Sequence, residues 1–444
     1  MKKYLYFVIA TLVLTSCSKE EKPIVVTAEN YHQTVDKITD IMVHDIFSPP
    51  VASRIYAYSN LAAYQIMRQE NKDLIDFTSK FEELKPIPEA DTTANINFKL
   101  AALVAKMEIG KKLIFSENVL TTYRDSLYTK WKKTNEVEFN SSKDYGLAVA
   151  RHLSAWIDKD NYKETRTMPK YSVYSDDPAR WQPTPPSYMD GIEPHWPKIR
   201  PFTLDSASQF KPAPHPEFSL KKGTAFYDEL IEVYEIKNEM ERKGDESEEM
   251  KIAQFWDCNP YVSTQRGHLM FATKKITPGG HWMGICKIAS KKAGLDFAQS
   301  SYAYTTTAIA LADGFISCWD EKYRSNLVRP ETLINKLIDD NWKPVLQTPP
   351  FPEYSSGHSV VSGAASIVLT RIFGDDFHFE DDTEVKYGLP VRTFTSFSHA
   401  ANEAAISRLY GGIHYRSAVE NGIIQGRNLG NHVVENLNIK PLTY

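Results

Sequence analysis

From about residue 28 to residue 160, the hydrophobic positions repeat at the spacing of a helix. Apolar side chains recur at intervals of three and four from Ile38 to Ile46, and the same spacing returns in 57–64, 100–114 and 123–156. Such intervals place side chains on one face of an α-helix, whereas a half-buried strand needs strict alternation. We therefore predict a set of helices whose aromatic and methionine side chains form core.

The character of the sequence changes between Pro178 and Pro216, where ten prolines fall. Proline removes a backbone donor and interrupts helices. The same stretch carries Trp181, His195 and Trp196, and the large apolar side chains of the two tryptophans need to be buried. We predict an extended segment that wraps the helices rather than a flexible linker.

Helical spacing resumes at 223–256 and again at 295–317, and we find neither a series of alternating strands nor an internal repeat. The prediction is a single all-α domain over 28–444, built as a helical bundle. We divide it into a helical scaffold at 28–290, which includes the proline-rich wrap at 178–216, and a site-bearing core at 291–444.

Residues 1–16 have the pattern of a bacterial lipoprotein signal peptide, with two lysines followed by the apolar run 4–14. That run is too short to span a bilayer comfortably. It ends in Leu14-Thr15-Ser16-Cys17, which resembles a lipobox with Cys17 as the acylated residue, and 17–27 is then a tether. An uncleaved anchor is the alternative.

No later apolar run approaches the roughly 18 residues that a transmembrane helix needs. The expected location is therefore the bacterial outer membrane, periplasmic or surface-exposed, with membrane contact only through the lipid. A net charge of −4 gives no support for nucleic-acid binding. The oligomeric state is not readable from the sequence.

Three cysteines follow Cys17, namely Cys258, Cys286 and Cys318. They form no Cys-x-x-Cys pair and no recognisable Cys/His spacing, so we expect no zinc site. An odd number in an exported chain leaves at least one thiol free or paired outside the chain, and the sequence does not choose a disulfide.

The candidate chemistry lies in three short clusters of the last third of the chain. The first has Lys322, six spacers and Arg329-Pro330; the second is Ser355-Ser356-Gly357-His358; the third has Arg408, five spacers and His414. Together they supply cations, hydroxyls, a glycine amide and two imidazoles. These groups suit a tetrahedral oxyanion and chemistry performed on it.

Helix ends give a reason for the clusters to meet. A serine cap before Gly357 opens a helix that Gly374 stops, and free N–H groups at a helix start favour an anion. Arg408 is expected on the last turn of a helix that glycines break before His414, and Pro330 places Arg329 near a helix end. The alternative, a structural salt-bridge network, is favoured by any one cluster alone but not by their conjunction.

The three clusters resemble the signature shared by vanadium-dependent haloperoxidases and the type 2 phosphatidic acid phosphatase superfamily. The bacterial vanadium iodoperoxidases are the most similar branch, because Trp319 stands three residues before Lys322 and the segments 255–261 and 278–282 are also similar. The resemblance covers most of the mature chain, but only the clusters are specific to the superfamily.

The resemblance implies vanadate as cofactor and hydrogen peroxide and halide as substrates. It makes His414 the direct vanadium ligand, His358 the base that deprotonates peroxide, and Lys322 both an anion contact and a polarising group. The implied vanadate-binding residues are Trp319, Lys322, Arg329, Ser356, Gly357, His358, Arg408 and His414. The implied halide pocket contains Phe351 and Tyr261.

Algal bromoperoxidases carry a second histidine at the position of Phe351, so this residue agrees better with an iodide- or chloride-type pocket. The resemblance to the bacterial iodoperoxidase branch favours iodide, with bromide possible. The alternative function is an exported acid phosphatase in which His414 forms a phosphohistidine. Its relatives often orient that histidine with an aspartate four residues later, where this chain has Ala418, so Asp320 or a backbone carbonyl is the expected orienting group. A third possibility, an oxyanion-binding lipoprotein without turnover, leaves His358 without a role.

Overall fold

The structure is a computed structural model, and it describes residues 22–266, 269–272 and 274–443. The predicted signal peptide at 1–16 and the predicted lipidation site Cys17 lie outside the described residues. None of the described helices combines the length and the apolar character that crossing a bilayer requires.

The first half of the chain forms helices, as the spacing of apolar residues predicts. They are α1 (Ala28–His44), α2 (Pro49–Glu70), α3 (Phe98–Leu113), α4 (Glu117–Thr134), α5 (Glu136–Ile157) and the short α6 (Tyr162–Thr165). Single 3-10 turns, η1 (Thr78–Lys80) and η2 (Trp196–Lys198), lie in the connections. The N-cap residues Ser48, Asn97 and Asn135 each accept a backbone N–H of the following helix, which fixes where α2, α3 and α5 begin.

The second half continues with helices and adds two small hairpins. The helices are α7 (Ala225–Lys243), α8 (Glu248–Phe255), α9 (Pro278–Lys292), α10 (Phe297–Ser325), α11 (Pro330–Leu337), α12 (Gly357–Phe373), α13 (Phe397–Tyr410) and α14 (Arg416–Asn436), with 3-10 turns η3 (Gly244–Glu246) and η4 (Val385–Tyr387). The antiparallel pairs are β1 (Ser263–Arg266) with β2 (Leu269–Ala272) and β3 (Phe379–Asp381) with β4 (Arg392–Phe394). The all-α prediction is confirmed, and these short hairpins are additions to it.

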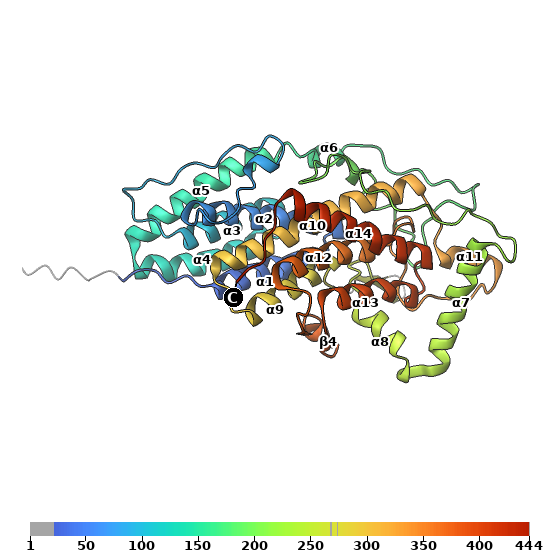
Figure 1. Cartoon of the computed structure of the whole chain (residues 1–444). Helices are drawn as coiled ribbons and strands as arrows, with labels where there is room; N and C mark the ends of the chain where they lie inside the picture. Colours follow the sequence, from blue (N-terminus) through green and yellow to red (C-terminus); the bar gives the residue numbers. More distant parts are fainter. Residues whose placement is uncertain (1–21, 267–268, 273, 444) are drawn as a thin grey trace, which may run out of the picture.

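Helix α10 runs through the centre of the molecule, with α2 on one side and α12 on the other (Figure 1). It begins at a capping box formed by Asp296 and Gln299 and ends at Asn326, whose backbone is left-handed. The helix is longer than the predicted 295–317, so Trp319 and Lys322 lie on its last turns. One rigid element therefore connects the core to the first cluster.

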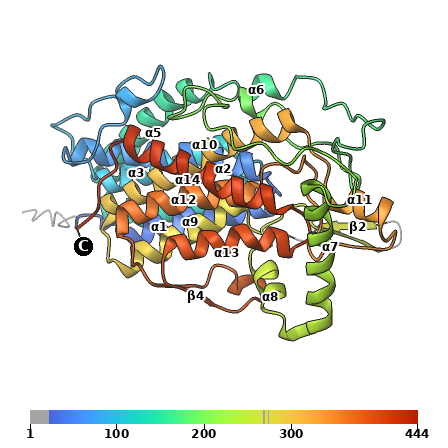
Figure 2. The same ribbon diagram turned by 45° about the vertical axis from the view of Figure 1, so that its right-hand side comes forward.

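Helices α12 and α14 lie side by side in both views (Figures 1 and 2), because glycines on each let the backbones touch. A methyl group added at Gly426 would lie 2.0 Å from the carbonyl oxygen of Val360, and one at Gly363 would lie 2.8 Å from that of Ile423. At the start of the pair, the Ser356 N–H donates to the Ala418 carbonyl at 3.1 Å. This packing brings the second and third clusters together.

The proline-rich segment is extended and partly buried, as predicted. Trp181 and Trp196 are fully buried, and the N–H of Trp181 donates to the carbonyl of Asn326 at the end of α10. The N–H of Ile192 donates to the carbonyl of Pro350 at 3.0 Å. The segment thus braces α10 and the loop that leads into α12. Buried apolar residues form one large cluster from Ile24 to Ile439, while the division at 290 and 291 stays a prediction.

The close approach of α12 and α14 predicts a stability difference between two glycine substitutions. Gly426→Ala should lower the free energy of unfolding by about 1–3 kcal/mol, because the methyl group overpacks the contact with Val360. Gly314→Ala, at a buried helical position whose nearest neighbour is an ordinary 3.6 Å away, should leave stability unchanged or raise it. Denaturant unfolding of both variants checks this. Equal destabilisation of the two would contradict the packing account.

Candidate functional site

The three clusters meet at one cavity that encloses about 420 Å³ of space, part of it open to solvent. Gly357 and His358 of the second cluster and Arg408 and His414 of the third line it, together with Trp319 and Phe351. The first cluster lies behind this lining, where Nη1 of Arg329 contacts Nε2 of His414. The loop after α8 supplies the opposite wall through Cys258, Asn259, Pro260 and Tyr261. Helix ends therefore form the site, as predicted, and a loop that is far away in sequence completes it.

Two buried arginines at this cavity keep part of their guanidinium groups unpaired. Arg329, the N-cap of α11, donates from Nε to the Phe351 carbonyl at 3.0 Å and from Nη1 to the Ile413 carbonyl at 2.8 Å, while its Nη2 has no partner among the described residues. Arg408, on the last turn of α13, donates from Nη1 to the Trp256 carbonyl at 2.9 Å, while its Nε finds no partner in the part of the chain that the structure describes. Burial lowers the pKa of Arg329 to about 10, which reflects the cost of this charge in the absence of an anion.

Lys322 lies under the loop that leads into α12. Its ammonium donates to three backbone carbonyls, those of Pro352 at 3.0 Å, Glu353 at 3.0 Å and Ser355 at 2.6 Å. All three N–H groups are therefore engaged, and burial lowers the pKa of Lys322 to about 7. A contact between Lys322 and an anion oxygen, as predicted, requires one of these bonds to be exchanged.

His414 is held between a carboxylate and a guanidinium. Its Nδ1 lies 2.8 Å from Oε1 of Glu353, and Nη1 of Arg329 lies 3.1 Å from its Nε2. Because a guanidinium can only donate, Nε2 is the acceptor and Nδ1 carries the proton that Glu353 accepts. Burial lowers the pKa of His414 well below its ordinary value, and Arg329 adds to this effect. His414 therefore presents a neutral nitrogen lone pair from Nε2.

Glu353 is the orienting group that the sequence analysis missed. Asp320 was one of two expected partners for His414, but it pairs instead with Arg324 at 3.2 Å on the outer part of α10. Glu353 is fully buried and also accepts the Tyr415 N–H at 2.9 Å. One feature of the sequence could have identified it, because it is the only acidic residue between Asp340 and Asp375.

The second cluster opens α12 as predicted. Ser356 is the N-cap, and its hydroxyl accepts the Ser359 N–H at 3.3 Å. A methyl group at Gly357 would lie 3.6 Å from the Trp319 ring, so this residue packs directly on α10. Within the described ranges the Nε2 of His358 has no partner. Burial, aided by the charge of Arg408, lowers the pKa of His358 well below its ordinary value. His358 is thus a neutral base at the cavity.

The predicted aromatic residues line the same cavity, with one unexpected contact. The Trp319 indole N–H donates to the carbonyl of Ile192 at 3.1 Å, so it is held by the proline-rich segment. Its ring lies 4.9 Å from that of Phe351, centroid to centroid. Tyr261 lines the opposite wall, and burial raises its pKa well above the ordinary value. The wall around Phe351 is therefore largely apolar.

The charge balance of the site suits an oxyanion. Within the described residues, Lys322, Arg329 and Arg408 form no ion pair with a carboxylate, although all three are buried. Burying cations without counter-charge is costly, whereas the unpaired guanidinium N–H groups of Arg329 and Arg408 would be satisfied by the oxygens of a bound tetrahedral anion. The structural salt-bridge network considered above is not formed, and vanadate fits the donor set.

Comparisons with known proteins agree with this geometry. The family described as the second helical-bundle domain of VCPO matches residues 302–439. The crystal structure of the first bacterial vanadium-dependent iodoperoxidase is similar with 60% identity and a TM-score of 0.92, over 96% of this chain and 100% of that one. No curated protein sequence matches.

Two bacterial vanadium-dependent chloroperoxidase structures share the fold at 18% identity. The holo form has a TM-score of 0.66 over 89% of this chain and 93% of its own, and the apo form has a TM-score of 0.65 over 88% and 94%. The chain belongs to the vanadium-dependent haloperoxidase family. It is a halide peroxidase with vanadate as cofactor, and the phosphatase alternative is not favoured.

The buried Lys322 predicts that anion affinity falls as pH rises. A bound anion keeps the ammonium charged, so the pKa of Lys322 in the complex lies above its value of about 7 in the free protein. Below that pKa binding needs no proton. Above the pKa of the free protein each binding event takes up one proton, so the affinity for the anion should fall by up to about tenfold per pH unit.

Calorimetric titration with molybdate, which stays a dianion across the neutral range, measures this dependence. Lys322→Met should bind molybdate more weakly and should lose the fall in affinity above pH 7. A wild-type affinity that stays constant or increases above pH 7 would contradict the assignment of Lys322.

Proposed function

We propose that this enzyme oxidises iodide in preference to bromide, using hydrogen peroxide and a vanadate ion bound to Nε2 of His414. The observation that carries the proposal is the position of this nitrogen. The Glu353 carboxylate holds the proton on Nδ1, so the lone pair is on Nε2, at a cavity that Arg408 also lines. Nη1 of Arg329 now donates to this nitrogen, and a bound anion would take over that guanidinium, whose Nη2 is unpaired within the described residues. A neutral imidazole with its other nitrogen bonded to a carboxylate is the usual form of a metal-ligating histidine.

The residues proposed to hold vanadate divide the work between charge and hydrogen bonding. Arg329 and Arg408 donate to its oxygens, and Lys322 adds positive charge from the last turns of α10. Ser356 and the Gly357 amide lie at the start of α12, where the helix dipole favours an anion. When bound, vanadate supplies a Lewis acid that activates hydrogen peroxide toward halide without an electron-transfer partner.

His358 is proposed as the base that takes a proton from hydrogen peroxide. Its lowered pKa keeps the ring neutral, and its unpaired Nε2 lines the cavity, so it can accept a proton there. The neighbouring guanidinium of Arg408 disfavours the imidazolium, so the proton is readily passed on. Lys322 is proposed to polarise the oxygen that halide attacks.

The halide preference is supported by the apolar wall. Phe351 takes the place of the second histidine of algal bromoperoxidases, whose imidazole would favour a smaller, more strongly hydrated halide. The Phe351 ring packs against that of Trp319, and Tyr261 lines the same cavity. Iodide is large, polarisable and the easiest of the halides to oxidise. The 60% identical solved structure is that of an iodoperoxidase, which agrees with this choice.

The decisive experiment strips the purified protein of metal and phosphate, then titrates it with orthovanadate while following triiodide formation. Parallel runs use bromide and a chromogenic phosphate ester. Saturable, vanadate-dependent iodide oxidation that phosphate competes away, exceeding bromide oxidation, is the expected result. Ester hydrolysis inhibited by vanadate, without halide oxidation, would make the protein a phosphatase instead.

Variants separate the proposed roles of the site residues. His414→Ala should abolish vanadate binding, while His358→Ala should bind vanadate and lose about 10²–10⁴-fold in turnover, since general base catalysis supplies that much. Glu353→Gln should weaken vanadate binding by about 10–100-fold, because a neutral amide raises the basicity of the His414 ligand less than a carboxylate does. The matched control is Asp320→Asn, which should behave as wild type. Full activity in His414→Ala would refute the assignment.

We propose further that the chain is exported and anchored to the outer membrane through a lipid on Cys17. The pattern of residues 1–16 and the lipobox-like sequence support this. In cells that process lipoproteins, the wild-type chain should partition with membranes and the Cys17→Ser variant should not. Equal partitioning of the two would contradict the anchor.

A further inference from the structure

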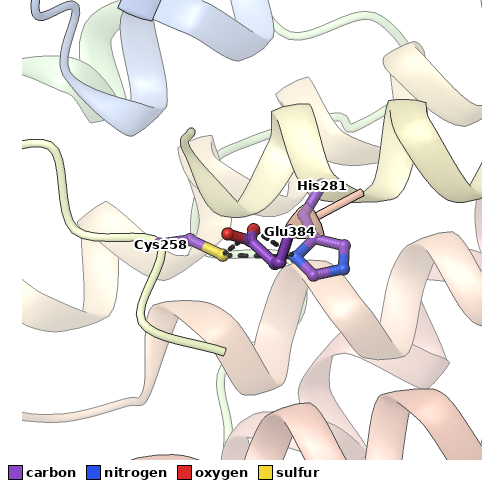
Figure 3. A group of neighbouring side chains, drawn as sticks. All are labelled: Cys258, His281 and Glu384. Atoms are coloured by element: carbon purple, nitrogen blue, oxygen red, sulfur yellow. Dashed lines mark hydrogen bonds and ion pairs between the residues drawn. The ribbon is translucent and has the colours of Figure 1, made fainter. Parts of the chain in front are cut away.

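A second group of buried side chains lies behind the loop wall of the cavity and takes no part in the proposed reaction. Cys258 follows α8, His281 lies in the first turns of α9, and Glu384 precedes η4; their side chains converge in Figure 3. Nδ1 of His281 lies 3.4 Å from the Cys258 sulfur and 3.1 Å from Oε1 of Glu384, which is 3.8 Å from the sulfur. All three residues are buried.

The hydrogen bonds around His281 decide which ring nitrogen faces this group. On the far side of the ring, Nε2 lies 2.8 Å from Oδ2 of the fully buried Asp381, whose other oxygen accepts the Thr383 hydroxyl at 2.6 Å. A carboxylate can only accept, so Nε2 carries the proton in the neutral ring. The lone pair of Nδ1 then faces the sulfur of Cys258 and the carboxylate of Glu384. Three electron-pair donors are thus directed at one point.

The spacing of these donors matches a tetrahedral metal centre. Zinc binds sulfur at about 2.3 Å and nitrogen or oxygen at about 2.0–2.2 Å, so tetrahedral ligand atoms are roughly 3.3–3.6 Å apart. The three observed separations lie between 3.1 and 3.8 Å. A histidine whose other nitrogen donates to a buried carboxylate is also the usual arrangement behind a zinc ligand.

We propose that Cys258, His281 and Glu384 bind one zinc ion. No zinc site is predicted from short Cys/His spacings, because Cys258 and Glu384 are 126 residues apart and meet only in the folded chain. The thiol of Cys258 loses its proton on binding, and that proton leaves to solvent. None of the residues proposed to hold vanadate is a ligand to this ion.

The contacts of the cluster indicate a structural role for the zinc ion. The ring of Trp256 stacks on that of His281 with centroids 4.4 Å apart, and the Trp256 carbonyl accepts Nη1 of Arg408. A zinc ion would tie the loop after α8, which carries Trp256 and Cys258, to α9 and to the segment before η4. It would thereby fix the cavity wall that anchors Arg408.

The competing occupant of the cluster is a proton. Burial alone lowers the pKa of His281, but the facing Asp381 and Cys258 outweigh it and raise that pKa well above its ordinary value. An imidazolium donating to Glu384 would satisfy the same atoms without a metal. The two occupants differ in zinc content and in the state of the thiol, and both can be measured.

The test uses the full chain purified, incubated with zinc and dialysed, with zinc counted by elemental mass spectrometry. We expect one zinc per chain in the wild type and loss of zinc in Cys258→Ala and Glu384→Gln. The control Cys286→Ala, which removes a different buried free thiol from α9, the helix that carries His281, should retain zinc. Zinc should also raise the melting temperature of the wild type and not of Cys258→Ala.

A measurement on the wild type alone guards against variants that fail to fold. Cobalt loaded in place of zinc should give the ultraviolet charge-transfer band of a thiolate ligand. A wild-type chain that retains no zinc, a cobalt protein without that band, or full zinc content in Cys258→Ala would each overturn the proposal and leave the proton as occupant. None of these readouts depends on vanadate or on halide oxidation.

Discussion

The site depends on an imbalance of buried charge. Arg408 lines the cavity and Lys322 and Arg329 are buried behind its wall. The Glu353 carboxylate lies near Lys322 and Arg329 but is itself committed to His414 and Tyr415. Removing charges from water costs several kcal/mol each unless they are paired. The free protein thus carries an unfavourable field that an oxyanion relieves. Affinity for the anion and the electrophilic character of the site follow from the same excess of positive charge.

The fold makes this imbalance tolerable by holding the charged groups rigidly. The long helix α10 passes from the apolar core to Lys322, whose three hydrogen bonds clamp the loop before α12. Glycine contacts between α12 and α14, with Gly426 against Val360, bring the start of one helix beside that of the other. The proline-rich segment supports the same region through Ile192. Stability elsewhere in the bundle thus maintains a site that is electrostatically unfavourable when empty of anion.

Much of this was predictable from the sequence because it depends on local rules. Apolar spacing predicts the helices, and caps and breakers locate Gly357, Arg329 and Arg408 at helix ends. What could not be predicted depends on contacts between distant segments. Glu353 reaches His414 across 61 residues, and Ile192 accepts the Trp319 N–H across 127. The two short hairpins, and the cluster of Cys258, His281 and Glu384, likewise form only when the chain is folded.

The central claim is that His414 offers Nε2 to the cofactor while Arg329 and Arg408 hold its oxygens. A crystal structure of the vanadate-loaded protein, with vanadium located by its anomalous scattering, tests this directly. The account predicts vanadium within bonding distance of Nε2 of His414, with Glu353 still on Nδ1 and both guanidinium groups on the anion. Vanadium bound to His358 instead, or an anion held away from both arginines, would contradict it.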